Sequence, residues 1–275
     1  MNLDLPLNEY SFVAFDTEAS GAYPVGFDIV ELGAVKWYRG QEVGRLQFLF
    51  KPRELMSDFI IGIHGITNEM VQDAPAMGEK IREIHEFFKG SIVLAHHAPF
   101  DMGFLALEFE KAFLPLPVEP ALCTSLLSRK LIHGVENHKL QTLVQHLNLE
   151  GGQAHRAYDD AKACLQVAFA CFAKMAPEVT LAEAIKTQGK NLLWPRYSIQ
   201  ALNDEKSQVL IQAIGTKKNV DMIYWAGSLK GKTRRVTPLG IVRNPDGDFL
   251  QAICHLENVS KRYYLNKIGD VAIVY

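Results

Sequence analysis

The stretch Ser11–Gly21, SFVAFDTEASG, decides the fold of this chain. Its apolar run Phe12–Phe15 is typical of a strand that is buried on both faces, as at the centre of an α/β sheet. The run ends in Asp16 and Glu18, and side chains two positions apart on a strand point to the same face. Two like charges there stay ionised only beside a positive charge, and a divalent cation would provide one. The alternative is a solvated strand end with two incidental acids.

Length and composition favour an ordinary globular protein. The 275 residues allow one large domain, or a medium domain and a small one. With 48% hydrophobic and 22% charged residues, and no apolar run near the ~18 residues that span a bilayer, we expect a cytoplasmic protein without membrane contact. Cysteines without zinc-ligand spacing are expected as reduced core residues. They are Cys123, Cys164, Cys171 and Cys254.

Charge is distributed unevenly along the chain, although the net charge is only −2. Residues 1–200 hold 18 Lys/Arg and 24 Asp/Glu, whereas residues 201–275 hold 11 Lys/Arg and 7 Asp/Glu. This asymmetry favours two modules, one that holds metal and one that meets phosphate. Ordinary variation between two domains is the alternative.

Further strands and helices follow the first strand in an alternating order. Residues 63–67 are expected to be a loop, and Thr67 or Asn68 caps a short helix that ends at Val71. A helix follows between Pro75 and Gly90. The remaining strands are expected at 28–37, 45–50, 91–95 and from 121, and the remaining helices at 102–113, 140–147 and about 156–174.

Asp101 follows the apolar strand at 91–95 and stands where the next helix begins. A carboxylate is favoured at this position by capping and by the helix dipole. A simple N-cap is therefore one interpretation of Asp101, and a site residue is the other.

Asp160 lies on the buried face of the helix that begins near residue 156. It shares this face with small apolar residues such as Ala161 and Cys164, whereas Asp159 lies nearer Lys162 on a polar face. A buried carboxylate is costly unless it is paired or bound to metal. We therefore expect Asp160 to be functional and Asp159 to lie at the surface.

Carboxylates thus stand at the ends of three separate buried elements, and His155 precedes the last of them. Hard oxygen ligands suit Mg²⁺ or Mn²⁺, and two such ions ~4 Å apart hold the attacking and leaving oxygens of a phosphodiester in line. His155 can take a proton from water near neutral pH. The pattern therefore indicates two-metal phosphodiester hydrolysis.

The same residues resemble the three motifs of DEDDh-type 3′–5′ exonucleases over about residues 8–175. The motifs are Asp16-Thr17-Glu18, the stretch His96–Asp101, and His155 with Asp160 five positions on. The resemblance implies an RNase H-like fold and His155 as general base. The tyrosine variant of the superfamily is excluded because position 156 is Arg. The resemblance also implies metal ligands Asp16, Glu18, Asp101 and Asp160, and contacts to a substrate 3′ end from Thr17, His64, His96 and Phe100.

The second motif departs from the family at His97, where members often have Asn. Packing roles are the favoured interpretation of His96 and His97, with substrate contact as the alternative. The departure leaves the four acids untouched, so it concerns substrate handling more than chemistry.

From about residue 220 the pattern changes to short strands separated by turns, which is typical of a small twisted sheet or partly open barrel. Basic residues beside aromatic ones suit phosphate contact with base stacking. A solvated basic edge that deters strand pairing is the alternative. The candidates are Tyr224, Arg234, Arg235, Lys261 and Arg262.

Residues 206–275 also resemble a WYL domain, a small Sm-like β module. The resemblance rests on Ile223-Tyr224, on Arg234 with Pro238, and on Lys261–Tyr263. It implies binding of nucleic acid or of a nucleotide ligand, and regulation of the activity of the attached domain. The signature tripeptide is degenerate, since Asp248-Phe249-Leu250 occupies its place.

The sequence therefore predicts an exonuclease domain at 1–175, a linker with short helices at 176–205 and a WYL-like domain at 206–275. The predicted function is a two-metal 3′–5′ exonuclease that acts on a single-stranded DNA or RNA end and releases nucleoside 5′-monophosphates. The alternative is a nucleic-acid-sensing regulatory protein whose first domain serves for binding.

Overall fold

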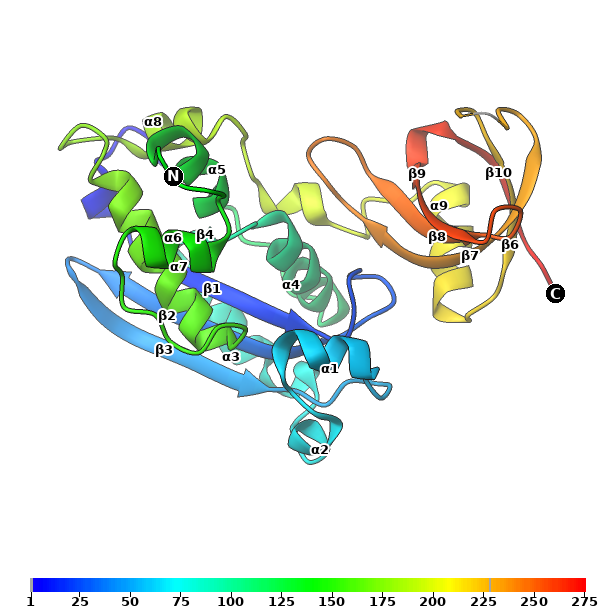
Figure 1. Cartoon of the computed structure of the whole chain (residues 1–275), viewed down its shortest axis with the longest axis horizontal. Helices are drawn as coiled ribbons and strands as arrows, with labels where there is room; N and C mark the ends of the chain where they lie inside the picture. Colours follow the sequence, from blue (N-terminus) through cyan, green and yellow to red (C-terminus); the bar gives the residue numbers. More distant parts are fainter. Residues whose placement is uncertain (1, 228) are drawn as a thin grey trace.

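The structure is a computed structural model that describes residues 2–227 and 229–275. Across these residues the strands form two five-stranded sheets, which lie in two lobes (Figure 1). The first sheet is mixed and has the strand order β3-β2-β1-β4-β5, and the second is antiparallel with the order β10-β6-β7-β8-β9. The predicted fold class, an RNase H-like mixed sheet followed by a small β domain, is confirmed.

β1 lies at the centre of the first sheet because both of its faces are apolar. It pairs antiparallel with β2 and parallel with β4. Val13 and Phe15 pack into a core on one face of the sheet, and Phe12 and Ala14 into a core on the other. The strands are β1 (Phe12–Ala19), β2 (Ile29–Tyr38), β3 (Gln41–Leu49), β4 (Ile92–Ala95) and β5 (Ala121–Cys123).

Helices cover both faces of this sheet. α3 (Met77–Phe88) and α4 (Pro99–Lys111) cover one face. The opposite face is covered by α5 (Thr124–Leu131), α6 (Leu140–His146), α7 (Ala157–Phe172) and α8 (Leu181–Gln188). The short 3-10 helices are η1 (Leu7–Glu9) and η2 (Trp194–Tyr197), and α2 (Asn68–Val71) is a single turn.

The sequence prediction missed helix α1 (Asp58–His64) and expected a loop from residue 63. The Ser57 side chain caps its N-terminus, and Gly65 ends it with a left-handed φ of 71°. Phe59 and Ile63 lie at its exposed surface, so its apolar residues do not form the one-sided stripe of an amphipathic helix. Ser57 and Gly65, which cap the helix, indicate it in the sequence, but a prediction based on hydrophobic periodicity does not use them.

The second domain consists of an antiparallel sheet with one long helix against it. Leu210 and Ala213 of α9 (Glu205–Gly215) pack into its apolar core. A further 3-10 helix is η3 (Leu265–Lys267). The strands are β6 (Val220–Tyr224), β7 (Thr233–Val242), β8 (Phe249–Cys254), β9 (Val259–Tyr264) and β10 (Ile268–Ile273).

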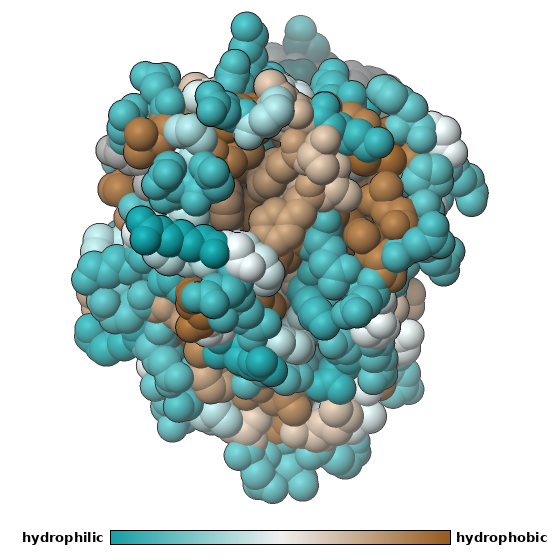
Figure 2. Space-filling model, turned by 90° about the vertical axis from the view of Figure 1, so that its left-hand side faces the viewer, coloured by the Kyte–Doolittle hydropathy of each residue, from teal (hydrophilic) through white to brown (hydrophobic). Residues whose placement is uncertain are grey.

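Figure 2 views the end of the first domain that lies away from the second and shows apolar side chains in a hollow of this face. The hollow has a volume of about 400 Å³, and Phe12, Trp37, Phe169 and Phe172 contribute to its lining. It therefore lies at the start of β1, whereas the acidic residues lie at the other end of that strand. None of the helices described is long and apolar enough to span a bilayer.

Candidate active site

The end of β1 and the first turns of two helices meet at one place. Asp16 and Glu18 lie in the second half of β1. Asp101 lies in the first turn of α4 and Asp160 in the first turn of α7, and His155 immediately precedes α7. The structure thus brings together all five residues that the sequence singles out as catalytic.

Gly33 of β2 allows α7 to lie directly on the sheet beside Asp16. Gly33 is the cross-strand neighbour of Asp16, and a Cβ added to it would lie 2.1 Å from the backbone nitrogen of Tyr158. No side chain fits into that space. Gly33 therefore determines how closely the first turn of α7, with Asp160, approaches the carboxylates of β1.

Asp101 is held in place by Thr17. The Thr17 backbone N–H and hydroxyl both donate to Asp101 Oδ1, at 3.0 and 2.8 Å. Asp101 is 2% and Thr17 4% exposed. Thr17, predicted to contact substrate, is thus a partner of Asp101 in the structure.

Asp160 is buried and accepts two hydrogen bonds. Gln141 Nε2 donates to its Oδ1 at 2.7 Å, and the backbone N–H of His155 donates to its Oδ2 at 3.0 Å. Asp159 points elsewhere and accepts from the backbone N–H of Gln153. The two adjacent aspartates therefore have the different environments that helical periodicity predicts.

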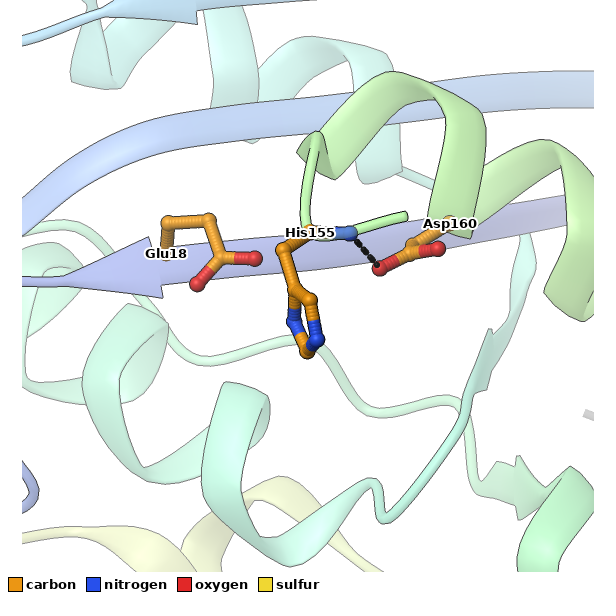
Figure 3. A group of neighbouring side chains, drawn as sticks. All are labelled: Glu18, His155 and Asp160. Atoms are coloured by element: carbon orange, nitrogen blue, oxygen red, sulfur yellow. Dashed lines mark hydrogen bonds between the residues drawn. The ribbon is translucent and has the colours of Figure 1, made fainter. Parts of the chain in front are cut away.

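Glu18, His155 and Asp160 form a group that could hold a metal ion. One ligand atom of each lies within 4.8 Å of those of the other two. Figure 3 shows the carboxylates of Glu18 and Asp160 directed toward each other, with His155 between them. His155 has a left-handed φ of 60°, an uncommon conformation for a non-glycine residue. Its side chain is exposed, so water and ligands can reach it.

A fifth carboxylate, Glu31, completes the site and was missed by the sequence prediction. It is the cross-strand neighbour of Glu18 and is fully buried. Arg156 pairs with it, and the backbone N–H of Ala157 donates to it at 3.0 Å. The only sequence signal was one acid inside the apolar strand Ile29–Tyr38.

Burial and mutual repulsion raise the pKa values of the carboxylates. The pKa of Asp16 is raised well above its ordinary value, by burial first and then by Asp101 and Glu18. Burial is also the main cause that raises the pKa of Glu18 to about 8 and that of Asp101 to about 7. A cation among them would favour the ionised forms. Oxygen donors of this kind fit a hard divalent cation.

Two other predicted substrate residues lie at the edges of this site. His64 ends α1 and is 4% exposed, and its Nδ1 accepts from the backbone N–H of Ile66 at 3.0 Å. Burial lowers the pKa of His64, and nearby His155 acts in the same direction. Phe100 precedes Asp101 and is half-buried against Phe104, with 5.0 Å between the ring centroids.

Both ring nitrogens of His96 are engaged within the protein. Nδ1 lies 2.8 Å from Thr124 Oγ1 and Nε2 lies 3.0 Å from the carbonyl oxygen of His138. Burial lowers the pKa of His96 to about 4, which keeps the ring neutral. His97 is exposed and has a left-handed φ of 71°.

The basic candidates of the second domain do not form one surface. Arg234 points into the domain between Tyr224 and Tyr263 and is 6% exposed. Arg235, on the opposite face of the strand, pairs with Asp221 at 2.9 Å.

The other two candidates lie on β9. Arg262 is exposed and lies over the ring of Phe249, 4.0 Å from its centroid. Lys261 pairs with Glu257. Arg262 is thus the candidate that is exposed without a carboxylate partner among the described residues.

Comparison with known proteins finds a matching family model for each of the two domains. Residues 13–168 match the family model described as Exonuclease, and residues 205–273 match that of the WYL domain. DNA polymerase III PolC-type of Oceanobacillus iheyensis is 39% identical over 160 residues, which are 58% of this chain and 11% of the relative. The protein of the same name from Bacillus subtilis is 38% identical over 161 residues, again 11% of its length. The chain thus matches about a tenth of the length of these relatives.

Solved structures of exonuclease I have a similar fold. Escherichia coli exonuclease I in complex with a dT13 oligonucleotide superposes with a TM-score of 0.56 at 18% identity, over 89% of this chain and 55% of that chain. A structure of exonuclease I without ligand gives a TM-score of 0.55 at 17% identity, over 95% and 64%. At these identities the likeness concerns the fold. On the evidence of the family match, which covers more than half of its length, the chain belongs to the Exonuclease family and carries a WYL domain at residues 205–273.

Proposed function

We propose that this protein is a DEDDh-type 3′–5′ exonuclease that removes nucleoside 5′-monophosphates from a single-stranded DNA or RNA end. The observation that carries the proposal is the convergence of Glu18, His155 and Asp160, with ligand atoms within 4.8 Å of one another, beside Asp16 and Asp101. Membership of the Exonuclease family supports the reaction class. The PolC-type relatives support DNA as one substrate.

In this proposal Asp16, Glu18, Asp101 and Asp160 hold two divalent cations, Mg²⁺ or Mn²⁺. When bound, such a pair supplies the positive charge that an in-line displacement at phosphorus requires. The raised pKa values of Glu18 and Asp101 support this role, because these carboxylates need a cation in order to stay ionised at neutral pH. Thr17 then has the task of orienting Asp101.

We assign the role of general base to His155. Its ring is exposed and lies between Glu18 and Asp160, so a water molecule that attacks phosphorus there would lie within its reach. Its left-handed backbone is the kind of outlier that is often found at functional sites. Arg156, the position at which the tyrosine variant carries its base, donates to Glu31 and stays protonated.

His64 and Phe100 flank the same site, and we propose that they contact the 3′-terminal nucleotide. His64 Nδ1 already accepts from Ile66, so the neutral ring carries its proton on Nε2. This buried nitrogen has no hydrogen-bond partner by geometry among the described residues, so it would donate to a substrate hydroxyl. Phe100 offers a half-buried aromatic ring for base stacking.

For the WYL domain we propose contact with the substrate strand through Arg262. This guanidinium is exposed and stacked on Phe249, as suits a phosphate contact beside a base. Arg234 is instead the candidate for a small anionic ligand such as a nucleotide. It is a buried cation whose Nε has no partner among the described residues. In such a ligand the phosphate would compensate its charge.

A substrate panel tests this proposal. The purified protein is incubated in Mg²⁺ or Mn²⁺ with 5′-labelled single-stranded and double-stranded DNA and RNA, and products are resolved by length. We expect a ladder that shortens from the 3′ end and mononucleotide products, and we expect neither with Asp16→Ala. Tight binding without any product would favour the sensing alternative, and activity of Asp16→Ala equal to wild type would contradict the site.

A further inference from the structure

The loop of residues 20–28, between β1 and β2, joins the catalytic strand to the WYL domain. It begins two residues after Glu18 and reaches across to the second domain (Figure 1). Val25 in this loop belongs to the apolar cluster that forms the core of the WYL domain, together with Ile214 of α9 and Ile241 of β7. The exonuclease domain thus contributes a residue to the core of its neighbour.

Two glycines show how tightly this loop is held. A Cβ added to Gly240 of β7 would lie 2.2 Å from Tyr23 Cβ and 2.8 Å from the carbonyl oxygen of Val25. Gly26 has a left-handed φ of 125°, and a Cβ there would lie 2.8 Å from the carbonyl oxygen of Leu239. The backbones of the two domains are therefore in direct contact, with no space between them for even a methyl group.

The base of the loop is also fixed. The Ser20 backbone N–H donates to the Asp28 carbonyl at 2.8 Å, and the Asp28 N–H donates to Ser20 Oγ at 2.9 Å. Arg53 further holds the Asp28 side chain, with Nε 2.8 Å from Oδ1. A shift at the tip of the loop is therefore carried to its base, next to Glu18.

A second metal-site element is held in the same way. α4 carries Asp101 in its first turn, and near its other end the buried Glu110 accepts hydrogen bonds from Ser198, Ile199 and Gln200. Leu107 of α4 also packs against the core of the WYL domain. Two of the elements that carry candidate metal ligands are thus anchored to the second domain or to the segment before it.

We infer that the WYL domain positions the metal-binding carboxylates, with Tyr23 and Val25 as the positioning residues that hold Glu18 through the loop. This inference rests on the proposed function, since it assigns Glu18 to a metal site. Packed interiors move as units rather than deforming continuously, so displacement of the loop tip by one methyl group must be taken up at its base. In this inference the metal-binding carboxylates keep their positions only when the WYL domain is packed against the exonuclease domain.

The experiment adds one methyl group at either of two glycines near this interface. Gly240→Ala places it against Tyr23, whereas Gly215→Ala in α9 places it where no atom beyond the local helix backbone lies within 4 Å, so Gly215→Ala is the matched control. Mn²⁺ affinity is measured by calorimetry, and kcat and KM are measured with the p-nitrophenyl ester of thymidine 5′-monophosphate, a substrate with a single nucleotide. For Gly240→Ala we expect roughly tenfold weaker Mn²⁺ binding and a kcat lowered by about tenfold or more. Gly215→Ala should match wild type in both.

Wild-type Mn²⁺ affinity and kcat in Gly240→Ala would overturn the inference. Val25→Ala is the second variant in case Gly240→Ala does not fold. It removes the packing of the loop tip in the core of the WYL domain without a clash, and it should weaken Mn²⁺ binding in the same direction. A wild-type protein that binds Mn²⁺ but hydrolyses nothing would contradict the proposed function alone, and the calorimetric comparison would still decide on the positioning role.

Discussion

Arg156 donates to the buried carboxylate of Glu31 from both Nε and Nη2, and the Nη2–Oε1 distance is 2.8 Å. Glu31 is fully buried one strand away from Glu18, so this ion pair forms one wall of the acidic site. Arg156 also lowers the pKa of Glu18, against the larger effect of burial. Arg156 therefore has two effects: it compensates the buried charge of Glu31, and it favours the ionised form of Glu18.

Arg156→Ala should destabilise the protein because it leaves Glu31 buried without its cation. We expect the free energy of unfolding to fall by about 3 kcal/mol, the lower end for a buried pair, because the Arg156 side chain is partly exposed. Arg53→Ala is the control, because it breaks the exposed pair with Asp28 and should cost only about 0.5 kcal/mol. Urea unfolding of both variants measures the difference, and equal losses would contradict the importance of the buried pair.

Gly33→Ala should act on the site through the backbone of α7. The added Cβ would lie about 2 Å from backbone atoms of Ala157 and Tyr158, which cannot rotate away. We expect a loss of about 2–3 kcal/mol in stability together with weaker metal binding, as overpacking forces the helix off the sheet. Gly62→Ala in α1, where no atom beyond the local helix backbone lies within 4 Å of the new Cβ, should leave both unchanged. If Gly33→Ala behaves like Gly62→Ala, the proposed close approach of α7 is wrong.

The stability of the metal-free protein should fall as pH rises from 6.5 to about 8. Glu18, with a pKa of about 8, and Asp101, with a pKa of about 7, bind protons in the folded state that the unfolded chain has already released. A raised carboxylate pKa thus stabilises the fold at low pH, and this contribution is lost through the folded pKa. Below pH 6.5 the lowered pKa values of His64 and His96 act in the opposite direction, so the window above it is the cleanest.

Thermal or urea unfolding in EDTA measures this slope, which should amount to about 1–2 kcal/mol over the window. Saturating Mn²⁺ should remove it, because a bound cation keeps the carboxylates ionised in the folded state. Glu18→Gln should reduce the slope in EDTA. A free energy of unfolding that does not change with pH in EDTA would contradict the raised pKa values of these carboxylates. A slope that Mn²⁺ leaves unchanged would contradict their role as metal ligands.

Arg262→Ala should weaken the binding of a single-stranded oligonucleotide and lower the salt dependence of the affinity by about one unit of log–log slope. Its guanidinium is exposed and has no carboxylate partner among the described residues. Arg235→Ala is the comparison, because Asp221 already neutralises Arg235. Fluorescence anisotropy over a range of salt concentrations gives both slopes. An identical effect of the two variants would remove the special role of Arg262.

Much of the site could be predicted because each acid follows a local rule. Asp16 and Glu18 end an apolar strand, and the periodicity of α7 separates Asp160 from Asp159. Asp101 lies in the first turn of α4 as expected, but it is not the N-cap, since the N-cap residue is Ala98 and Asp101 accepts from Thr17. These rules act within a few residues of chain. The convergence of the three segments then followed from the resemblance to a known family.

What the sequence did not reveal depends on contacts between distant segments. Glu31 and Gly33 look like ordinary members of an apolar strand until α7 is placed on them. The insertion of Val25 into the core of the WYL domain depends likewise on how two domains meet. One difference could have been predicted from the sequence. Arg234 and Arg235 are adjacent on a strand, so their side chains must point to opposite faces and cannot form one basic surface.

The adjacent pair Asp159 and Asp160 allows a direct test of whether the acidic site binds catalytic metal ions. Hydrolysis of a 5′-labelled single-stranded oligonucleotide in Mn²⁺ is compared for Asp160→Ala and Asp159→Ala, which remove the same charge one residue apart on α7. We expect Asp160→Ala to retain at most about 1% of the wild-type rate, because the cations that position the reacting groups lose a ligand, and Asp159→Ala to stay near wild type. Equal activity of the two variants would contradict a metal site built on Asp160.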